Sequence, residues 1–288
     1  EEAVMQMNLL ANHYLVMMLS PSPEPESVVI AGDWHGNRAW MKRALQEVHA
    51  AGHRLVIHVG DLKVLWTQEG PLSPQEQALM PGARDYDRFT VELASLLEEL
   101  EMTLLFIDGN HDNHPVLRAL PLDENGFGTI SNRLKYIPRG HRFTIAGVRF
   151  AGLGGAYSID RAWGKQGVDW WPEEAVTPED VAALGTESVD VLITHEVPAG
   201  VDVVKKMVLP GLVEMEANIS RWLIRDAVRN VTPKLVFSGH WHQSLTQQLP
   251  YSGTTVHVLD MDGRAGNLAV LDLAAVRRLA AAAPEPAP

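Results

Sequence analysis

The stretch SVVIAGDWHG, residues 27–36, decides the class of fold. Its β-branched, apolar first half is typical of a buried strand, and it passes directly into Gly32, Asp33 and His35. Four further apolar runs also end in polar residues, namely RLVIHVGD (54–61), TLLFIDGN (103–110), VDVLITHE (189–196) and KLVFSGH (234–240). Amphipathic stretches that predict helices lie at 38–51, 85–101 and 220–230. Strands that alternate with helices indicate β-α-β units around mostly parallel sheets.

Three other stretches predict antiparallel strands and hairpins. They are RFTIAGVRFAGLGG (142–155), TTVHVLDMDG (254–263) and NLAVLDL (267–273). Within the second of them, LDMDGR (259–264) is typical of a hairpin with an Asp-Gly turn. We therefore expect an α/β fold in which two mixed β-sheets pack face to face and are flanked by helices.

The composition narrows the classes of function. The chain has 288 residues, of which 46% are hydrophobic, and it is long enough to bury a large core. A net charge of −12 argues against the broad cationic surface of a non-specific nucleic-acid binder. Because the sequence contains no cysteine, any metal must be held by His, Asp, Glu or Asn, and a cytoplasmic location is expected.

Both ends of the chain are expected to lie outside the folded domain. The apolar stretch at 4–20 is interrupted by Gln6 and Asn8, so it falls short of a membrane span, and no positively charged segment precedes it. We interpret it as a packed helix or an added leader. The expected organisation is a leader and linker over 1–26, one domain over 27–275 and a flexible Ala/Pro-rich tail over 276–288.

Residues that can bind a metal follow all five apolar runs. Ligands of α/β sheets bind beyond the carboxyl ends of the strands, where several loops meet. The spacing of Asp33 and His35 predicts that both side chains project the same way from an extended segment. GHWH (239–242) has two histidines at the same spacing, so the same is expected of them. The same alternation predicts that Trp34 and Trp241 point away and pack against the protein.

This ordered series of motifs resembles that of the calcineurin-like metallophosphoesterases. The family series GDxH, GD, GNHD, H and GHxH appears here as GDWHG (32–36), GDLK (60–63), GNHD (109–112), THE (194–196) and GHWH (239–242). The resemblance spans about 27–272. It implies a four-layer αββα sandwich and a hydrolase that acts on phosphoric ester bonds.

The resemblance also implies a binuclear metal centre. Its ligands would be Asp33, His35 and His242 for the first ion, Asn110, His195 and His240 for the second, and Asp61 as the bridge between them. Manganese is the expected ion, with iron, zinc, nickel and magnesium as alternatives for such oxygen and nitrogen ligands. In the family's mechanism a hydroxide that bridges the ions attacks phosphorus, and His111 would protonate the leaving oxygen.

Two motifs differ from those of the protein serine/threonine phosphatases in this superfamily. Val64 and Leu65 stand where those enzymes have an Asp that orients the catalytic histidine and an Arg that binds phosphate, and Asp108 replaces another Arg. The bacterial or phage-type branch of phosphodiesterases and phosphatases therefore fits better. Asp112 becomes the candidate residue that orients His111 or holds the turn of the third motif.

The expected substrate is a small phosphoester such as a nucleotide ester, and hydrolysis of a diester is the preferred activity. The alternatives are a phosphomonoesterase, protein phosphatases included, a nuclease on the same scaffold, and a binding protein on an inactive fold. The long segments 67–85 and 152–180 could set substrate choice. The candidate substrate contacts are Lys63, Arg161 and Arg264. No membrane partner and no extended nucleic-acid surface are expected, and the sequence does not predict the oligomeric state.

Overall fold

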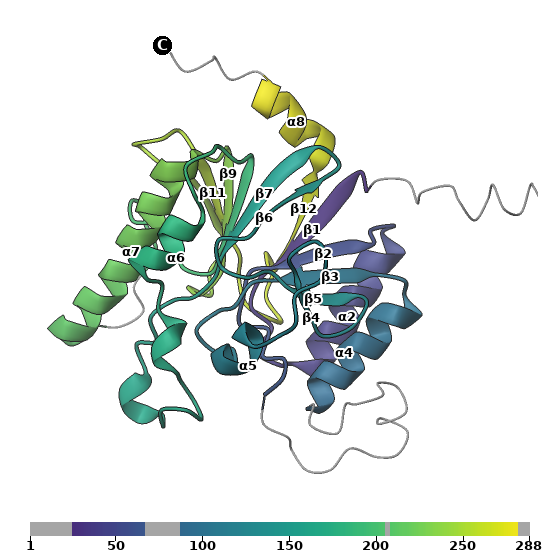
Figure 1. Cartoon of the computed structure of the whole chain (residues 1–288), viewed down its shortest axis with the longest axis horizontal. Helices are drawn as coiled ribbons and strands as arrows, with labels where there is room; N and C mark the ends of the chain where they lie inside the picture. The colour runs from purple at the N-terminus through teal and green to yellow at the C-terminus, as the bar shows by residue number, and fades with distance from the viewer. Residues whose placement is uncertain (1–24, 67–86, 205–207, 282–288) are drawn as a thin grey trace, which may run out of the picture.

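Two six-stranded sheets pack face to face in a computed structural model that describes residues 25–66, 87–204 and 208–281 (Figure 1). In each sheet four neighbouring strands are parallel, and an antiparallel strand lies at either edge. This is the arrangement of mixed sheets that the sequence predicts. Parallel central strands matter for function because their carboxyl ends all point to one edge of the sheet.

The first sheet has the strand order β12-β1-β2-β3-β5-β4. Its strands are β1 (Ser27–Ala31), β2 (Leu55–His58), β3 (Thr103–Phe106), β4 (Gly128–Thr129), β5 (Leu134–Tyr136) and β12 (Leu268–Asp272). The second sheet has the order β10-β11-β9-β8-β7-β6. Its strands are β6 (Arg142–Ile145), β7 (Val148–Leu153), β8 (Val191–Thr194), β9 (Leu235–Ser238), β10 (Leu245–Gln248) and β11 (Thr255–Val258).

Helices cover the outer face of each sheet, so the fold has four layers (Figure 1). The first sheet is covered by α2 (Arg38–Ala50) and α4 (Arg88–Glu99), and the second by α6 (Pro178–Ala183) and α7 (Gly211–Val231). The remaining helical segments are α5 (His114–Arg118), η2 (Arg161–Trp163), η3 (Pro172–Glu174) and α8 (Leu273–Ala281). None of the described helices is long and apolar enough to cross a membrane.

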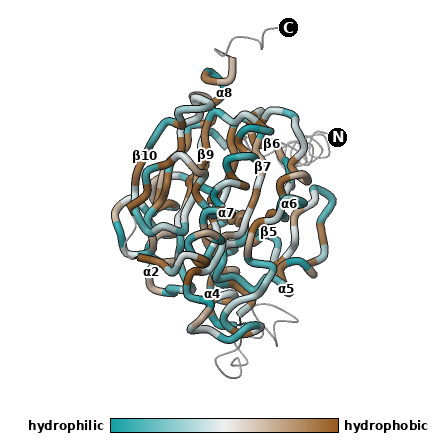
Figure 2. The backbone as a smooth tube through the Cα atoms, turned by 90° about the vertical axis from the view of Figure 1, so that its left-hand side faces the viewer, coloured by the Kyte–Doolittle hydropathy of each residue, from teal (hydrophilic) through white to brown (hydrophobic). Residues whose placement is uncertain are grey.

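Alternation along β1 shows how the layers are built. Val28 and Ile30 pack between the two sheets, whereas Val29 and Ala31 pack beneath α2 and α4. The strands at the middle of the molecule carry much of the hydrophobic sequence, and many outer turns are hydrophilic (Figure 2). A strand that is buried on both faces has no polar alternation, which is why these segments are continuous apolar runs.

The structure differs from the sequence-based expectation in four places. LDMDGR is not a hairpin turn, because β11 lies in the second sheet and β12 in the first, so 259–267 crosses between the sheets. β11 is antiparallel to β10 but parallel to β9. α7 begins at Gly211 rather than at 220. α8 continues to Ala281 with Val276 buried, so 276–281, assigned to the flexible tail, are helical.

Residues 1–24 and 67–86 lie outside the described residues, and with them most of the expected leader and the first of the two candidate substrate segments. The second candidate segment, 152–180, is described. It contains the end of β7, both short η helices and the start of α6.

Candidate metal centre

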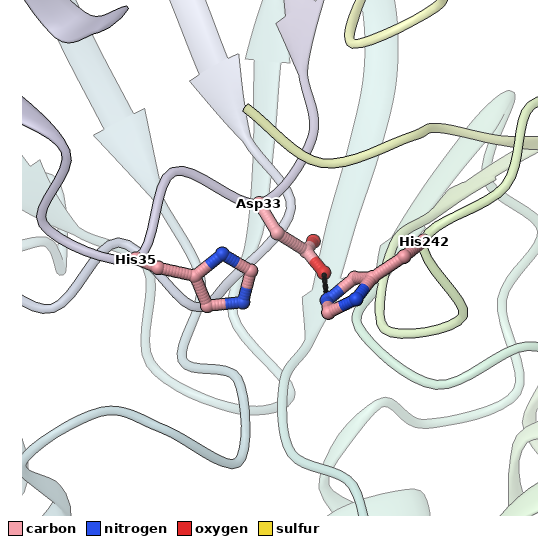
Figure 3. Close-up of side chains that lie close together, drawn as sticks. All are labelled: Asp33, His35 and His242. Carbon is pink, nitrogen blue, oxygen red and sulfur yellow. Dashed lines mark ion pairs between the residues drawn. The ribbon is translucent and has the colours of Figure 1, made fainter. Parts of the chain in front are cut away.

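The seven candidate metal ligands lie in loops that follow β1, β2, β3, β8 and β9. Asp33 is at the centre of one group, with His35 and His242 on either side of it (Figure 3). The Nε2 atom of His242 lies 3.2 Å from Oδ2 of Asp33. The three side chains offer ligand atoms that all lie within 4.8 Å of one another. His242 lies more than 200 positions from Asp33 and His35 in the sequence, so the three meet only in the folded chain.

Asp61 stands between this group and a second one. Its Oδ2 lies 3.5 Å from Nε2 of His35, and its Oδ1 lies 3.4 Å from Nε2 of His195. The same nitrogen of His195 is 3.0 Å from Oδ1 of Asn110. The ring of His240 is next to that of His195, with the two centroids 5.1 Å apart. The carboxylate of Asp61 therefore faces one histidine of each group. This is the arrangement needed for the bridging role that the resemblance implies for Asp61.

Left-handed turns aim these side chains inward. His35, Asp61, His240 and His242 have φ angles of 48°, 54°, 66° and 48°, in a region that residues other than glycine rarely adopt. The expectation that each Asp-x-His or His-x-His pair projects from an extended segment is therefore wrong. Such conformations cost roughly 1–3 kcal/mol each and persist where the surrounding structure enforces them, characteristically at functional sites.

Glycines at the ends of the strands make room for the carboxylates. A Cβ atom on Gly109 would lie 2.1 Å from Oδ1 of Asp61, and one on Gly239 would lie 2.1 Å from Oδ1 of Asp33. A Cβ atom on Gly60 would lie 2.6 Å from the ring of His195. Only glycine permits such close approach of backbone and side chains, so these positions shape the centre.

The residues present fit a pair of divalent cations. Asp33 is fully buried and its Oδ1 atom has no hydrogen-bond partner among the described residues, which is costly for a carboxylate unless a cation is bound. Asp61 and His195 are also buried. Carboxylate, amide and imidazole ligands suit manganese, iron, zinc, nickel or magnesium. The donor set and the burial thus support a metal centre without selecting the metal.

The electrostatic field of the centre favours positive charge. Burial alone would lower the pKa of His35, but its hydrogen bond to Asp61 and the charge of that carboxylate raise the pKa to about 9. Burial would also lower the pKa of His195, and Asp61 raises it to about 10. Burial would raise the pKa of Asp61, yet His195 and His111 hold that pKa well below its usual range. A divalent cation would take the place of these protons.

A comparison with protein families decides the class of protein. The model of the family described as calcineurin-like phosphoesterase matches residues 27–244, which is most of the chain. The chain belongs to the calcineurin-like phosphoesterase family. Membership implies a metal-dependent hydrolase of phosphoric esters, and the family typically binds two metal ions. A comparison with curated proteins found no significant match.

Solved structures resemble this phosphoesterase at low sequence identity. One is 15% identical with a TM-score of 0.51, covering 87% of this chain and 96% of that one, and it shares the fold. The protein TT1561 of Thermus thermophilus is 14% identical with a TM-score of 0.49, covering 88% of this chain and 96% of that one. A dimetal phosphatase from Danio rerio is 13% identical with a TM-score of 0.47, covering 83% of this chain and 88% of that one.

Asp112 of the phosphoesterase joins the second and third motifs. Its Oδ2 accepts hydrogen bonds from the backbone N–H groups of Gly109 (2.7 Å) and Asp61 (2.9 Å), and its Oδ1 accepts one from Lys63 (2.7 Å). Among the described residues, no hydrogen bond joins its carboxylate to the ring of His111. The backbone N–H of His111 donates to Oδ1 of Asp61 at 2.7 Å, which ties the candidate acid to the candidate bridge.

Segment 152–180 supports the centre through Ser158. The amide nitrogen of Asn110 donates to Oγ of Ser158 at 2.9 Å, which leaves Oδ1 of Asn110 facing His195. Ser158 is buried, and its backbone N–H donates to Glu174. Sequence reasoning missed Ser158 because a serine in a loop carries no motif.

A cavity of about 340 Å³ opens beside the candidate ligands. One side of it is formed by the centre, through Asp61, Asn110, His111, His240 and His242. The other lining residues come from segment 152–180, from the loops between β8 and α7, from α7 itself and from the loop after β9; they are Ile159, Asp160, Trp163, Glu196, Val204, Leu209, Glu214, Ala217, Asn218, Arg221 and Trp241. Trp241 packs against the core as expected and donates to Glu196, but it also lines the cavity, so only the expectation that it points away from the site is wrong. Trp34 is fully buried and donates to Asn267 as a packing residue.

Lys63, Arg161 and Arg264, the three candidate substrate contacts, are not among the described residues that line this cavity. Arg161 donates from Nε to Oε1 of Glu174 at 2.6 Å and stacks over Tyr157. The ammonium of Lys63 lies over the ring of Trp66, 5.1 Å from its centroid. Arg264 is exposed in the loop between β11 and β12. Their contact with substrate stays a prediction.

Proposed function

We propose that this phosphoesterase hydrolyses small phosphodiesters rather than phosphomonoesters. The observation that carries this proposal is the charge of the cavity. Among its described lining residues Arg221 is the one arginine or lysine, while Asp160, Glu196 and Glu214 are acids. A monoester dianion carries one more negative charge than a diester, and a cavity with this lining would stabilise it less.

The guanidinium of Arg221 is already engaged by the protein. Its Nε donates to the carbonyl of Val197 at 3.3 Å, and its Nη2 donates to the carbonyls of Pro198 (3.3 Å) and Val201 (2.7 Å). It also lies over the ring of Trp241. These contacts support a structural position for Arg221, so the described lining offers little to bind a terminal phosphate.

The rest of the lining suits an uncharged or apolar ester group. Trp163, Ile159 and Leu209 supply apolar surface opposite the centre, and Asn218 adds an amide that can donate and accept hydrogen bonds. The exposed fraction of Trp163 is 80%, so its ring is accessible to a ligand. An aryl or nucleoside group could stack on such a ring.

Two divalent ions at the centre would supply Lewis-acid polarisation of the phosphoryl group and of water. The chain's own contribution to the leaving group would come from His111, which lines the cavity beside Asp61. Its imidazolium would donate a proton to the leaving oxygen as the P–O bond breaks, and the apolar wall would exclude water from that oxygen.

The test compares kcat/KM for bis-p-nitrophenyl phosphate and p-nitrophenyl phosphate, with metal-stripped protein reconstituted with manganese. The proposal expects at least about a tenfold preference for the diester, which corresponds to about 1.4 kcal/mol between the two transition states. A preference for the monoester would contradict it.

The role of His111 is tested with leaving groups of different basicity. His111→Gln should reduce turnover of an alkyl phosphodiester by about 10²–10⁴-fold, because the alkoxide needs a proton, and should affect a p-nitrophenyl ester less. Manganese binding to the variant should equal that of the unsubstituted protein. Equal losses on both esters would remove the proposed role.

A further inference from the structure

Two carboxylates outside the candidate ligand set each face a candidate metal-binding histidine. Each lies next to the ring nitrogen that we do not assign to the metal. Asp262, in the loop that crosses between the sheets, faces His35: its Oδ1 lies 3.2 Å from Nδ1 of that ring. Glu196, which follows His195 in the chain, faces His240: its Oε2 lies 3.7 Å from Nε2 of that ring. Neither residue is among the seven ligands that the motifs indicate.

Both carboxylates are held in the same way. One oxygen accepts hydrogen bonds from the protein, and the other faces the histidine ring. Oδ2 of Asp262 accepts from the side-chain amide of Asn37 at 2.6 Å. Asn37 is itself fixed, since its Oδ1 caps α2 by accepting from the backbone N–H of Trp40. The oxygen of Asp262 that is left over points to His35.

Glu196 is anchored more deeply. Its Oε1 accepts from the indole of Trp241 and from the backbone N–H of Val197, both at 2.7 Å. The residue is 1% exposed, and its Oε2 has no hydrogen-bond partner among the described residues. A buried carboxylate oxygen without a partner is costly, and the ring that it faces belongs to His240.

The tautomer of a histidine decides which of its nitrogens can bind a metal. An imidazole that donates N–H from one nitrogen presents a lone pair at the other. Nδ1 of His195 already donates to the backbone carbonyl of Val59 at 2.8 Å, which leaves its Nε2 to face Asp61 and Asn110. At the corresponding nitrogen His35 has a carboxylate within hydrogen-bond distance, at 3.2 Å, and His240 has one in a longer ion pair, at 3.7 Å.

We infer that Asp262 and Glu196 are positioning residues, which fix the tautomer and orientation of His35 and His240 and so set the affinity of the two metal positions separately. Asp262 leaves Nε2 of His35 for the ion next to Asp33. Glu196 leaves Nδ1 of His240 for the ion next to Asn110. The inference rests on the metal centre that the proposed function uses, although the metal titration that tests it needs no substrate.

The conservative amides are the sharpest variants. In Glu196→Gln the amide oxygen must stay with the two N–H donors of Trp241 and Val197, so its NH₂ group faces His240 and demands an acceptor there. The ring would then carry its proton on Nδ1 and could not bind through that atom. Asp262→Asn reverses the contact with His35 in the same way, because Asn37 holds the other oxygen.

The measurement is a calorimetric titration of metal-stripped protein with manganese. The unsubstituted protein should bind two ions, and each variant should bind one of them about 10–100-fold more weakly, as found when such partners of metal ligands are removed. To assign each effect to one of the two metal positions, the amide variants are also combined with His35→Ala or His240→Ala, each of which removes one position. Glu196→Gln should weaken the ion that remains in His35→Ala but change nothing in His240→Ala, and Asp262→Asn should do the reverse.

Asp260→Asn is the matched control. This carboxylate lies in the same loop as Asp262 and accepts from the backbone N–H of Met261, so its replacement should leave both affinities unchanged. Nitrogen NMR of the imidazoles in the single variants gives a second readout, in which the tautomer of His240 or His35 should switch. A purely structural role would not move that signal.

The outcomes separate this inference from the proposed function. Two ions bound by both variants with the affinities of the unsubstituted protein would overturn the inference alone. So would unchanged metal binding with a raised KM in Glu196→Gln, since Glu196 would then contact substrate rather than position a ligand. If the unsubstituted protein bound none of manganese, iron, zinc, nickel and magnesium, the inference and the proposed function would fall together.

Discussion

At the scale of single residues, the centre depends on glycines, which have no side chain, as much as on the candidate ligands. Gly109 and Gly239 have no Cβ atom where one would collide with a candidate ligand carboxylate. Around them, four candidate ligands adopt left-handed backbone angles. Backbone strain of this kind is retained only where folding over-determines the conformation, and here it places carboxylates and imidazoles around a common space.

Gly109→Ala should therefore cost both stability and metal binding. Its Cβ would lie 2.1 Å from Oδ1 and 2.4 Å from the backbone nitrogen of Asp61, so the two loops must separate. We expect a loss of about 1–3 kcal/mol in the free energy of unfolding, as for other overpacked sites, together with loss of manganese binding. Urea unfolding and calorimetry measure the two effects.

The control for Gly109→Ala is Gly211→Ala. A Cβ on Gly211, at the start of α7, would have no described heavy atom within 4 Å. This variant should bind manganese as the unsubstituted protein does. Normal metal binding by Gly109→Ala would show that the close approach is not needed.

Buried His58 should make stability depend on pH. Its ring is fully buried against Trp34, and burial, assisted by the charge of His195, lowers the pKa of His58 to about 3. In the unfolded chain a histidine has a pKa near 6.5. As the pH falls below that value the unfolded chain takes up the proton and the folded chain does not, so stability decreases until about pH 3.

His58→Leu should remove this dependence. Between pH 7 and pH 5 the unsubstituted protein should lose about 2 kcal/mol more of its free energy of unfolding than the variant does. Urea unfolding of both proteins at the two pH values measures the difference. Parallel losses would mean that His58 is protonated in the folded chain at pH 5.

At the scale of elements, loops rather than strands hold the site together. Arg139, between β5 and β6, donates to the carboxylate of Asp108 at 2.6 Å and 2.9 Å and to that of Asp180 at 2.8 Å. It also donates to the carbonyls of Glu173, Glu174 and Ala175. Asp108, which follows β3, thus shares a partner with segment 152–180 and α6. The arginine that protein phosphatases carry at position 108 is absent, and a buried ion pair stands there instead.

Arg139→Met should be strongly destabilising. The side chain of Arg139 is 4% exposed and that of Asp108 is 1% exposed, so removal of the cation leaves a buried carboxylate whose remaining side-chain partners are the hydroxyl of Tyr136 and the ring of His114. Breaking such a pair costs about 3–5 kcal/mol. Chemical denaturation gives the value.

Arg133 provides the comparison for Arg139. It pairs with Glu98 at 3.0 Å, and the two side chains are 31% and 49% exposed, so Arg133→Met should cost no more than about 1 kcal/mol. Similar losses in the two variants would show that burial does not decide the strength of the Arg139 contacts.

The first half of α7 has an inverted pattern. Glu214 and Asn218 line the cavity, whereas Leu212 and Met215 are 75% and 46% exposed. An ordinary amphipathic helix places its apolar residues inward, and the expected start at 220 followed that rule. The inversion follows from the cavity beneath the helix, which no local pattern in the sequence reports.

At the scale of the whole molecule, the centre joins the two sheets. Asp33 and Asp61 follow strands of the first sheet, and His195 and His242 follow strands of the second. Ions bound there would link loops from both sheets. Because such ions bind the folded chain and not the unfolded one, they would stabilise the molecule as a unit.

Metal removal should therefore lower the melting temperature. At a free ion concentration 100 times its dissociation constant, each site adds about 2.7 kcal/mol, or about 5–10 °C for a chain of this order of size. Differential scanning fluorimetry with manganese and with a chelator measures the shift. Asp61→Asn, which changes the candidate bridge, should show a much smaller shift, and an equal shift would place the ions elsewhere.

The sequence by itself determined the strands that end in metal-binding residues, the helices between most of them and the class of reaction. It did so because buried strands are continuous apolar runs and the motifs follow one another along the chain. Only the tertiary structure decided how the ligands converge, since left-handed turns at His35 and His240 replace the extended pairs that spacing alone suggested. Only it brought Asp262 to His35 and shaped the cavity beneath α7, because contacts between residues 227 positions apart leave no local pattern in a sequence.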